Sequence, residues 1–155
     1  MLNILEDNYE NMLIGQYTSS IGEKHQVNLP KKFRDVLGDK LIITKGFENC
    51  LIIVSVENWK TLLEGTEGRP FTNKPARELQ RFLLGNATDV EIDGKGRFVI
   101  PEYLRKFAGI DKEIVFAGIQ RFVEIWDNKQ WEAHQKELSK DIDFIAEKLS
   151  RQEDE

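Results

Sequence analysis

TDVEIDGKGRFVIPEYLRKFAG, residues 88–109, repeats the pattern of YTSSIGEKHQVNLPKKFRDVLG, residues 17–38. Five positions are identical when the two stretches are aligned 71 residues apart: Ile21 and Ile92, Lys24 and Lys95, Pro30 and Pro101, Arg34 and Arg105, and Gly38 and Gly109. One inserted residue then shifts the separation to 72, so that Trp59 aligns with Trp131. Agreement over about forty positions with a single insertion indicates an internal duplication, the sequence signature of a repeat architecture.

Each copy predicts a strand, a turn, a strand, a short helix, two strands joined by a turn, and a final helix. Val90–Ile92 and Arg97–Ile100 flank the glycine-rich segment Asp93–Gly96, which is typical of a hairpin loop. Two further hairpins are predicted from paired apolar segments: 41–44 with 50–54, and 113–117 with 122–126. The sequence therefore predicts an α+β fold that is rich in β-structure.

Prolines and glycines mark the ends of the predicted short helices. Pro30 and Pro101 follow strands and can occupy a first helical turn, where a missing N–H costs nothing. Gly38 and Gly109 stand where the end of a helix favours left-handed backbone. The last helix is amphipathic and long, with one apolar stripe along it: Trp131, Leu138, Ile142, Ile145 and Leu149.

The composition changes between the two copies. Residues 65–75 are rich in Gly, Pro, Thr and Asn and predict a linker, which a short helix at 76–84 follows. The division of the chain that we expect is an N-terminal extension at 1–11, a first repeat at 12–64, a linker and short helix at 65–86, a second repeat at 87–136, and an acidic helix or tail at 137–155.

The formal net charge of −5 is unevenly distributed. Residues 1–16 carry three acids and no base, and residues 137–155 carry seven acids and three bases. The terminal segments therefore contribute −3 and −4, which leaves +2 for residues 17–136. Because affinity for a nucleic acid depends on neutralising phosphates, the mildly basic centre keeps a nucleic-acid partner possible.

The sequence offers no basis for catalysis. With two histidines in unrelated contexts and a single cysteine, it has neither a zinc-ligand spacing nor a nucleophile with its base. Cys50 lies in an apolar strand, where a small buried hydrophobe is the expected role. We expect no enzyme activity, cofactor, metal or small-molecule substrate. No apolar run reaches the roughly 18–20 residues of a membrane span, so we expect a cytoplasmic protein without a membrane partner.

The two loops at 22–26 and 93–97 hold the most informative charges. Segment 22–34 has a net charge of +3 and segment 93–106 a net charge of +2. Basic side chains on a hairpin can contact phosphates, and a two-stranded ribbon fits the major groove of DNA. A simple Asp-Gly turn with solvated charges is the alternative interpretation, and the loops on their own favour it.

Three stretches resemble the MraZ family, tandem-repeat members of the AbrB-like swapped-hairpin transcription factors. They are the segment MLIGQY at 12–17, the segment TKGFENCL at 44–51, and the segment DGKGRFVIP at 93–101, which is similar to the D-x-x-x-R signature of the family. The resemblance covers about residues 12–150. It implies two pseudo-symmetric AbrB-like repeats, forming a swapped-hairpin barrel, in one chain.

The resemblance also implies a function. Members of the family assemble into rings, for which we expect an octamer or larger homo-oligomer, and bind short direct repeats in double-stranded DNA upstream of their own operon. They generally act as repressors of a division and cell-wall gene cluster. By this resemblance we expect a sequence-specific, nucleoid-associated transcriptional regulator.

The residues that we expect at the DNA interface come from both copies: Lys24, Gln26, Arg34, Asp93, Lys95, Arg97 and Arg105. Arg97 is expected to contact a phosphate or guanine, with Asp93 accepting two guanidinium N–H bonds that fix its orientation. In the first copy Gly22 and Gln26 replace this aspartate and arginine. Either the first loop contacts a different base or groove, because Gln26 can bind adenine, or it is purely structural.

Two other functions remain open. An AbrB-like antitoxin would have a single copy followed by a disordered tail that wraps a toxin. A ring-forming interaction protein would have the same fold without DNA binding, which the altered first loop makes conceivable.

Overall fold

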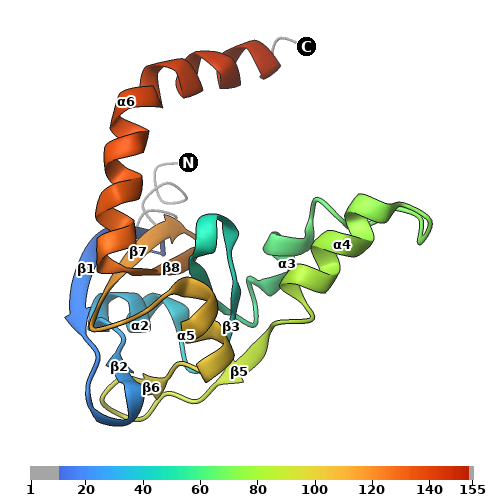
Figure 1. Ribbon diagram of the computed structural model, residues 1–155. Helices are drawn as coiled ribbons and strands as arrows, with labels where there is room; N and C mark the ends of the chain where they lie inside the picture. The colour runs from blue at the N-terminus through green and yellow to red at the C-terminus, as the bar shows by residue number, and fades with distance from the viewer. Residues whose placement is uncertain (1–10, 154–155) are drawn as a thin grey trace.

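The computed structural model describes residues 11–153, which form eight strands, five α-helices and two 3₁₀-helices (Figure 1). The strands are β1 (Leu13–Ser20), β2 (Gln26–Asn28), β3 (Leu41–Lys45), β4 (Leu51–Ser55), β5 (Thr88–Val90), β6 (Arg97–Val99), β7 (Glu113–Gln120) and β8 (Phe122–Asp127). The helices are η1 (Glu23–His25), α2 (Lys31–Leu37), η2 (Phe47–Asn49), α3 (Trp59–Leu63), α4 (Lys74–Leu83), α5 (Glu102–Ala108) and α6 (Asn128–Glu153). Of the N-terminal extension expected at 1–11, only Asn11 lies within the described residues.

Six strands form one antiparallel sheet in the order β1-β7-β8-β4-β3-β5, and β2 pairs with β6 in a separate two-stranded ribbon. The sheet is pseudo-symmetric, because β4 pairs with β8 around Ile52 and Glu124, which are equivalent positions in the two repeats. The ribbon is centred in the same way on Val27 and Phe98. Since β1 pairs with β7 and β5 with β3, each repeat completes the sheet of the other. The chain thus contains two pseudo-symmetric repeats with exchanged strands, as the resemblance implied.

The local hairpin predicted across Asp93–Gly96 is wrong, although the turn itself is present. The Asp93 amide donates to the Arg97 carbonyl and the Gly96 amide to the Asp93 carbonyl, both at 3.0 Å. The flanking strands then separate, because β5 pairs with β3 and β6 pairs with β2. Alternation of apolar and polar residues identifies a strand but not its partner, and strand exchange satisfies the same backbone hydrogen bonds.

The other two predicted hairpins and the two short helices are confirmed, but the helix expected at 76–84 begins earlier, at Lys74, and Gly38 has a ψ of −163°, outside the left-handed helical region. β3 pairs with β4, and β7 with β8, as antiparallel hairpins. Helices α2 and α5 begin directly after Pro30 and Pro101. They end at Gly38, with φ of 81°, and at Gly109, with φ of 62°. Glycine is suited to both positions because a side chain rarely adopts positive φ.

Both repeats contribute to one hydrophobic core. Phe33 of α2 and its equivalent Leu104 of α5 are fully buried, together with Ile43 and Phe116 from the sheet. Each such side chain stabilises the fold by about 1.5–3 kcal/mol. A smaller cluster joins Cys50, Val115 and Trp126 beneath Trp131 of α6, which confirms that the cysteine is a small buried hydrophobe.

Two segments extend beyond the sheet and its ribbon (Figure 1). Helix α4 lies on an arm formed by residues 65–86 (Figure 1). Asn73 caps the N-terminus of this helix, because its side chain accepts the Ala76 amide at 3.0 Å. Helix α6 packs through its first turns, but the far part of its predicted apolar stripe is exposed. Among the described residues, no helix has both the length and the apolar character needed to cross a membrane.

Candidate nucleic-acid interface

The β2–β6 ribbon presents one face to solvent. Val27 and Phe98 point inward and are buried, so the residues on either side of each point outward. The outward positions form two cross-strand pairs, Gln26 with Val99 and Asn28 with Arg97. Asn28 and Val99 were missed as candidate site residues, although their alternation with the apolar Val27 and Phe98 could have revealed them.

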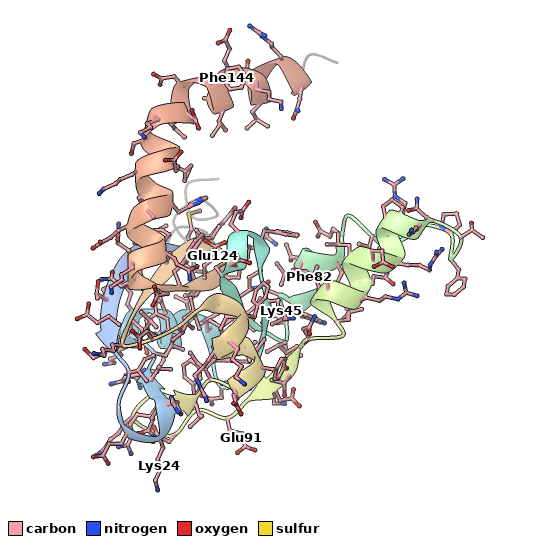
Figure 2. All side chains as sticks on the ribbon, in the orientation of Figure 1. Lys24, Lys45, Phe82, Glu91, Glu124 and Phe144 are labelled. Carbon is pink, nitrogen blue, oxygen red and sulfur yellow. The ribbon has the colours of Figure 1, made fainter. Side chains whose placement is uncertain are left out.

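A loop extends the ribbon at each end, since β2 and β6 are antiparallel and each follows its own loop. The loop before β2 carries Lys24, which lies at one extremity of the molecule in Figure 2. The loop before β6 carries Lys95, and both lysines are exposed. The two predicted loops therefore flank one short surface, about three residue pairs long.

Asp93 organises the loop of the second repeat. One carboxylate oxygen, Oδ1, accepts the backbone amides of Lys95 and Arg97, each at 2.9 Å. The other, Oδ2, accepts Arg97 Nε at 2.7 Å. The backbone bond from Arg97 is the main cause that lowers the pKa of Asp93, with the guanidinium and the Lys95 amide acting in the same direction. The carboxylate therefore holds both the turn and the arginine.

The predicted two-bond fork between Asp93 and Arg97 is not formed. A single guanidinium group, Nε, bonds to the carboxylate, because the second carboxylate oxygen is used by the two backbone amides. In the part of the chain that the structure describes, the Nη groups of Arg97 make no hydrogen bond. They are thus available to an acceptor outside the protein, and the side chain is 44% exposed.

The first loop is closed by the same backbone bond but lacks the carboxylate. The Gly22 amide donates to the Gln26 carbonyl at 2.8 Å, which repeats the bond between Asp93 and Arg97. Lys24 and His25 adopt positive φ, of 58° and 60°. Gly22 has no side chain to bond to Gln26 as Asp93 does to Arg97. The closing bond is therefore shared, while the backbone angles within the loop and the means of orienting the outward side chain differ, since Gly96 has positive φ and Lys95 does not.

Arg34 and Arg105 have equivalent places on the inner side of this region. Arg34 Nε donates to the Leu29 carbonyl at 3.0 Å, and Arg105 Nη1 donates to the carbonyl of Ile100, the equivalent of Leu29. Both arginines are partly buried. They bind the strand end that precedes each proline, so at least one guanidinium donor of each is used within the fold.

Among the described residues, no cluster of three or more His, Cys, Asp or Glu side chains could hold a metal ion. Burial is the main cause that raises the pKa of the Cys50 thiol, and the nearby Glu124 carboxylate raises it further. The thiol lies 3.5 Å from Glu124 Oε2. These surroundings keep the sulfur protonated, which is unfavourable for a nucleophile.

The exchanged strands and the exposed, charged ribbon define a tandem-repeat swapped-hairpin protein. A family model described as "MraZ protein, putative antitoxin-like" matches residues 12–82 and again residues 83–153. The chain belongs to the MraZ family.

Several relatives share most of their length with this chain. It is 42% identical over 138 residues to "Transcriptional regulator MraZ" of Caldanaerobacter subterraneus subsp. tengcongensis, covering 89% of this chain and 96% of the relative. The protein of the same name from Acetivibrio thermocellus is 40% identical over 139 residues, covering 90% and 97%. That from Clostridium tetani is 41% identical over 139 residues, with the same coverage. These relatives are thus named as transcriptional regulators and not as enzymes.

Proposed function

We propose that the protein is a sequence-specific, DNA-binding transcriptional regulator whose β2–β6 ribbon contacts double-stranded DNA. The observation that carries the proposal is the Asp93-held loop, which presents Arg97 outward from a two-stranded ribbon. A ribbon of this width fits the major groove, where an arginine distinguishes guanine by bonds to O6 and N7. The names of the relatives support the same class of function.

In this proposal the interface residues have different roles. Arg97 contacts guanine or phosphate, Lys24 and Lys95 contact phosphates, and Gln26 contacts adenine or a neighbouring base. Asp93 is a positioning residue, because both of its carboxylate oxygens accept hydrogen bonds from its own loop. Arg34 and Arg105, which we expected at the interface, support the ribbon from behind through their bonds to backbone carbonyls.

Each chain offers few phosphate contacts, so we propose that it acts as a ring of several subunits on tandem DNA boxes. Linked sites raise the effective concentration of each further contact without adding a new one. The family resemblance supports a repressor that binds short direct repeats upstream of its own operon, in a division and cell-wall cluster. Such a regulator associates with the nucleoid.

Fluorescence anisotropy with duplexes from the upstream DNA of the gene tests the proposal. We expect tighter binding to several boxes than to one, and a steep fall in affinity with salt, since each neutralised phosphate adds about 0.9 to the slope of log K against log salt. Arg97→Ala and Lys24→Ala should each weaken binding, whereas Lys60→Ala, an exposed lysine on α3, should not. Equal affinity for one box and for several would refute the ring-and-box part of the proposal.

The two rival functions are separated by the same experiment. The description of the family as antitoxin-like supports the antitoxin alternative. That alternative expects a single copy and a disordered tail, whereas this chain has two copies of the fold and a regular helix up to residue 153. If neither Arg97→Ala nor Lys24→Ala changes DNA binding while the oligomer persists, the interaction protein without DNA binding becomes the better explanation.

A further inference from the structure

Residues 65–86 form an arm that carries α4 away from the sheet (Figure 1). One side of α4 attaches the arm to the body, since Leu83 is buried and its carbonyl accepts Thr44 Oγ1 at 2.6 Å. Phe82 stacks on Phe47 at 5.9 Å between ring centroids and meets Phe107 edge-on at 6.0 Å. The arm is therefore fixed to both repeats at its base, and the opposite side of α4 faces outward.

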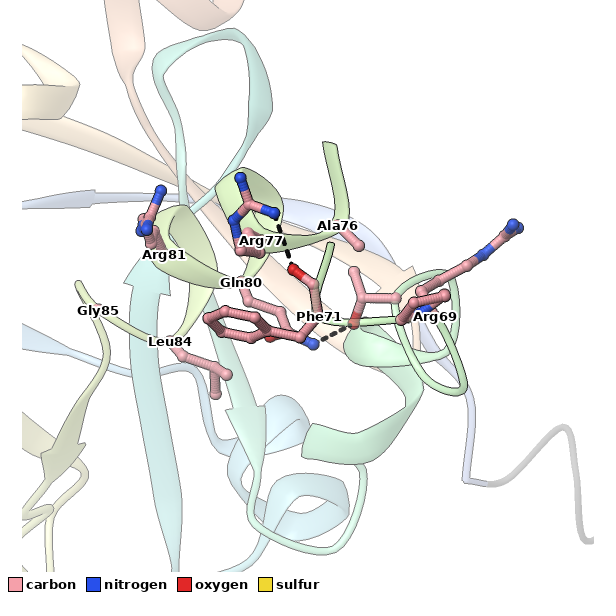
Figure 3. A pocket seen from close by; sticks show the side chains of 10 residues that line it. Arg69, Phe71, Ala76, Arg77, Gln80, Arg81, Leu84 and Gly85 are labelled. Atoms are coloured by element: carbon pink, nitrogen blue, oxygen red, sulfur yellow. Dashed lines mark hydrogen bonds between the residues drawn. The ribbon is translucent and has the colours of Figure 1, made fainter. Parts of the chain in front are cut away.

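The outward side of α4 borders a groove of about 510 Å³. Arg77, Gln80, Arg81 and Leu84 lie along one stripe of the helix, and Phe71 lies across from them (Figure 3). The loop that carries Phe71 is held in place, because Arg77 Nη1 donates to the Phe71 carbonyl at 2.8 Å. The Phe71 side chain nonetheless remains 86% exposed. The groove is thus preformed, aromatic and cationic.

The distal half of α6 has the complementary chemistry. Its apolar stripe is uncovered among the described residues, with Ile142, Ile145 and Leu149 between 44% and 58% exposed. Residues 137–155 have a net charge of −4, whereas the arm at 65–86 has four bases, two acids and a net charge of +2. An acidic, amphipathic helix is the kind of partner that a cationic groove with an exposed phenylalanine suits.

The charged residues also match in spacing. Arg77 and Arg81 are one helical turn apart on α4, and Glu137 and Asp141 are one turn apart beside the apolar stripe of α6. The ion pair between Arg81 and Glu78 within the arm is exposed on both sides and worth little, so it can be exchanged for another partner.

Pairing of α6 with α6 from another copy is less favourable. The spacing of Leu138, Ile142, Ile145 and Leu149 suits a helix–helix seam. Two such segments would, however, bring together two net charges of −4, whereas the arm offers the opposite sign.

We propose that the distal half of α6 from one copy docks in the arm groove of a second copy. The contact is head-to-tail, because a helix of one copy enters a different surface of the next, and contacts of this type generate rings or filaments. The inference rests on the self-association in the proposed function and not on DNA binding.

A charge reversal tests the contact in the full-length chain. Sedimentation velocity or mass photometry of Arg81→Glu and of Asp141→Arg should each show at least about a tenfold loss of association affinity, as expected for a contact near the centre of an interface. Lys74→Glu on the arm and Asp143→Arg on α6 are matched controls that lie away from the groove and the stripe, and both should assemble as the unaltered chain does.

Mixing the two weakened variants should restore assembly. In an assembly in which copies of the two variants alternate, the introduced glutamate on the arm of one copy meets the introduced arginine on α6 of its neighbour. The original Arg81 and Asp141 meet at the next, so restoration requires contacts between copies. Unchanged assembly of Arg81→Glu and Asp141→Arg would overturn the docking proposal alone, and a monomeric unaltered chain would overturn the ring as well. A loss of DNA affinity in Arg81→Glu with assembly unchanged would identify the groove as a nucleic-acid contact instead.

Discussion

Replacing Gly96 by alanine tests how the second-repeat loop is seated on the first repeat. Gly96 is buried with φ of 83°, and an added Cβ would lie 2.5 Å from Arg34 Cδ and 2.7 Å from its Cζ. The left-handed backbone costs an alanine about 1–2 kcal/mol. Displacing Arg34 from the Leu29 carbonyl costs about 0.5–1.5 kcal/mol more. We therefore expect the free energy of unfolding to fall by about 1.5–3.5 kcal/mol in total.

Urea denaturation at fixed protein concentration measures this change, since the stability of an oligomer depends on concentration. In a thermal melt of a chain of this size, the melting temperature should fall by roughly 3–14 °C. Gly94→Ala is the control in the same loop, because its φ is not positive and its Cβ would meet no atom within 4 Å, so its effect should stay within about 0.5 kcal/mol. If Gly96→Ala destabilised the protein no more than Gly94→Ala, the close packing of the loop against Arg34 would be refuted.

Three further predictions concern single side chains. Asp93→Asn should keep the turn but release Arg97, which should lower DNA affinity roughly threefold to tenfold in anisotropy, because the arginine must then be ordered on binding. Because the folded-state pKa of Asp93 is lowered, any contribution of its carboxylate to folding stability is present at neutral pH and is lost as the pH falls below about 4. A difference in stability between the unaltered protein and this variant that grew on acidification would contradict that contribution. The buried Cys50 thiol, with its raised pKa, should react with a thiol reagent at pH 8 only as fast as the protein unfolds, and rapid labelling of the native state would refute its burial. Phe33→Ala should lower the free energy of unfolding by about 3–5 kcal/mol in urea denaturation, whereas Val99→Ala, 51% exposed, should cost less than about 0.5 kcal/mol, and similar losses for both would contradict the shared core.

The predictions that succeeded depend on signals between residues close in the chain. Pro30 and Pro101 restrict their own backbone and remove their own N–H, so they mark the start of α2 and α5 without reference to the rest of the fold. The β3–β4 and β7–β8 hairpins likewise join neighbouring segments through short turns. The duplication strengthens these predictions, because each of these elements occurs in both repeats.

The predictions that failed depend on contacts between distant residues. The exchange of β5 and β6 between repeats leaves the pattern of each strand unchanged, so alternation could not exclude a local hairpin. The bond from Arg34 to the Leu29 carbonyl depends on where α2 lies relative to β2, which charge alone does not indicate. The sequence could therefore not show that one guanidinium nitrogen of Arg34 is used within the fold, and a DNA contact by its other nitrogens stays a prediction.

The two loops differ at outward positions, while the residues behind the ribbon are alike. Between the repeats, Gly22 replaces Asp93 and Gln26 replaces Arg97, and these positions are exposed or only partly buried. The residues behind them keep their character, since Val27 and Phe98 are both buried and apolar, and Arg34 and Arg105 both bind a strand-end carbonyl. Because the buried positions hold the ribbon in both repeats, the outward side chains can diverge without loss of the scaffold. Fusing two copies in one chain thus allows a pseudo-symmetric ribbon to present two chemically different ends, which a homodimer of a single repeat could not do.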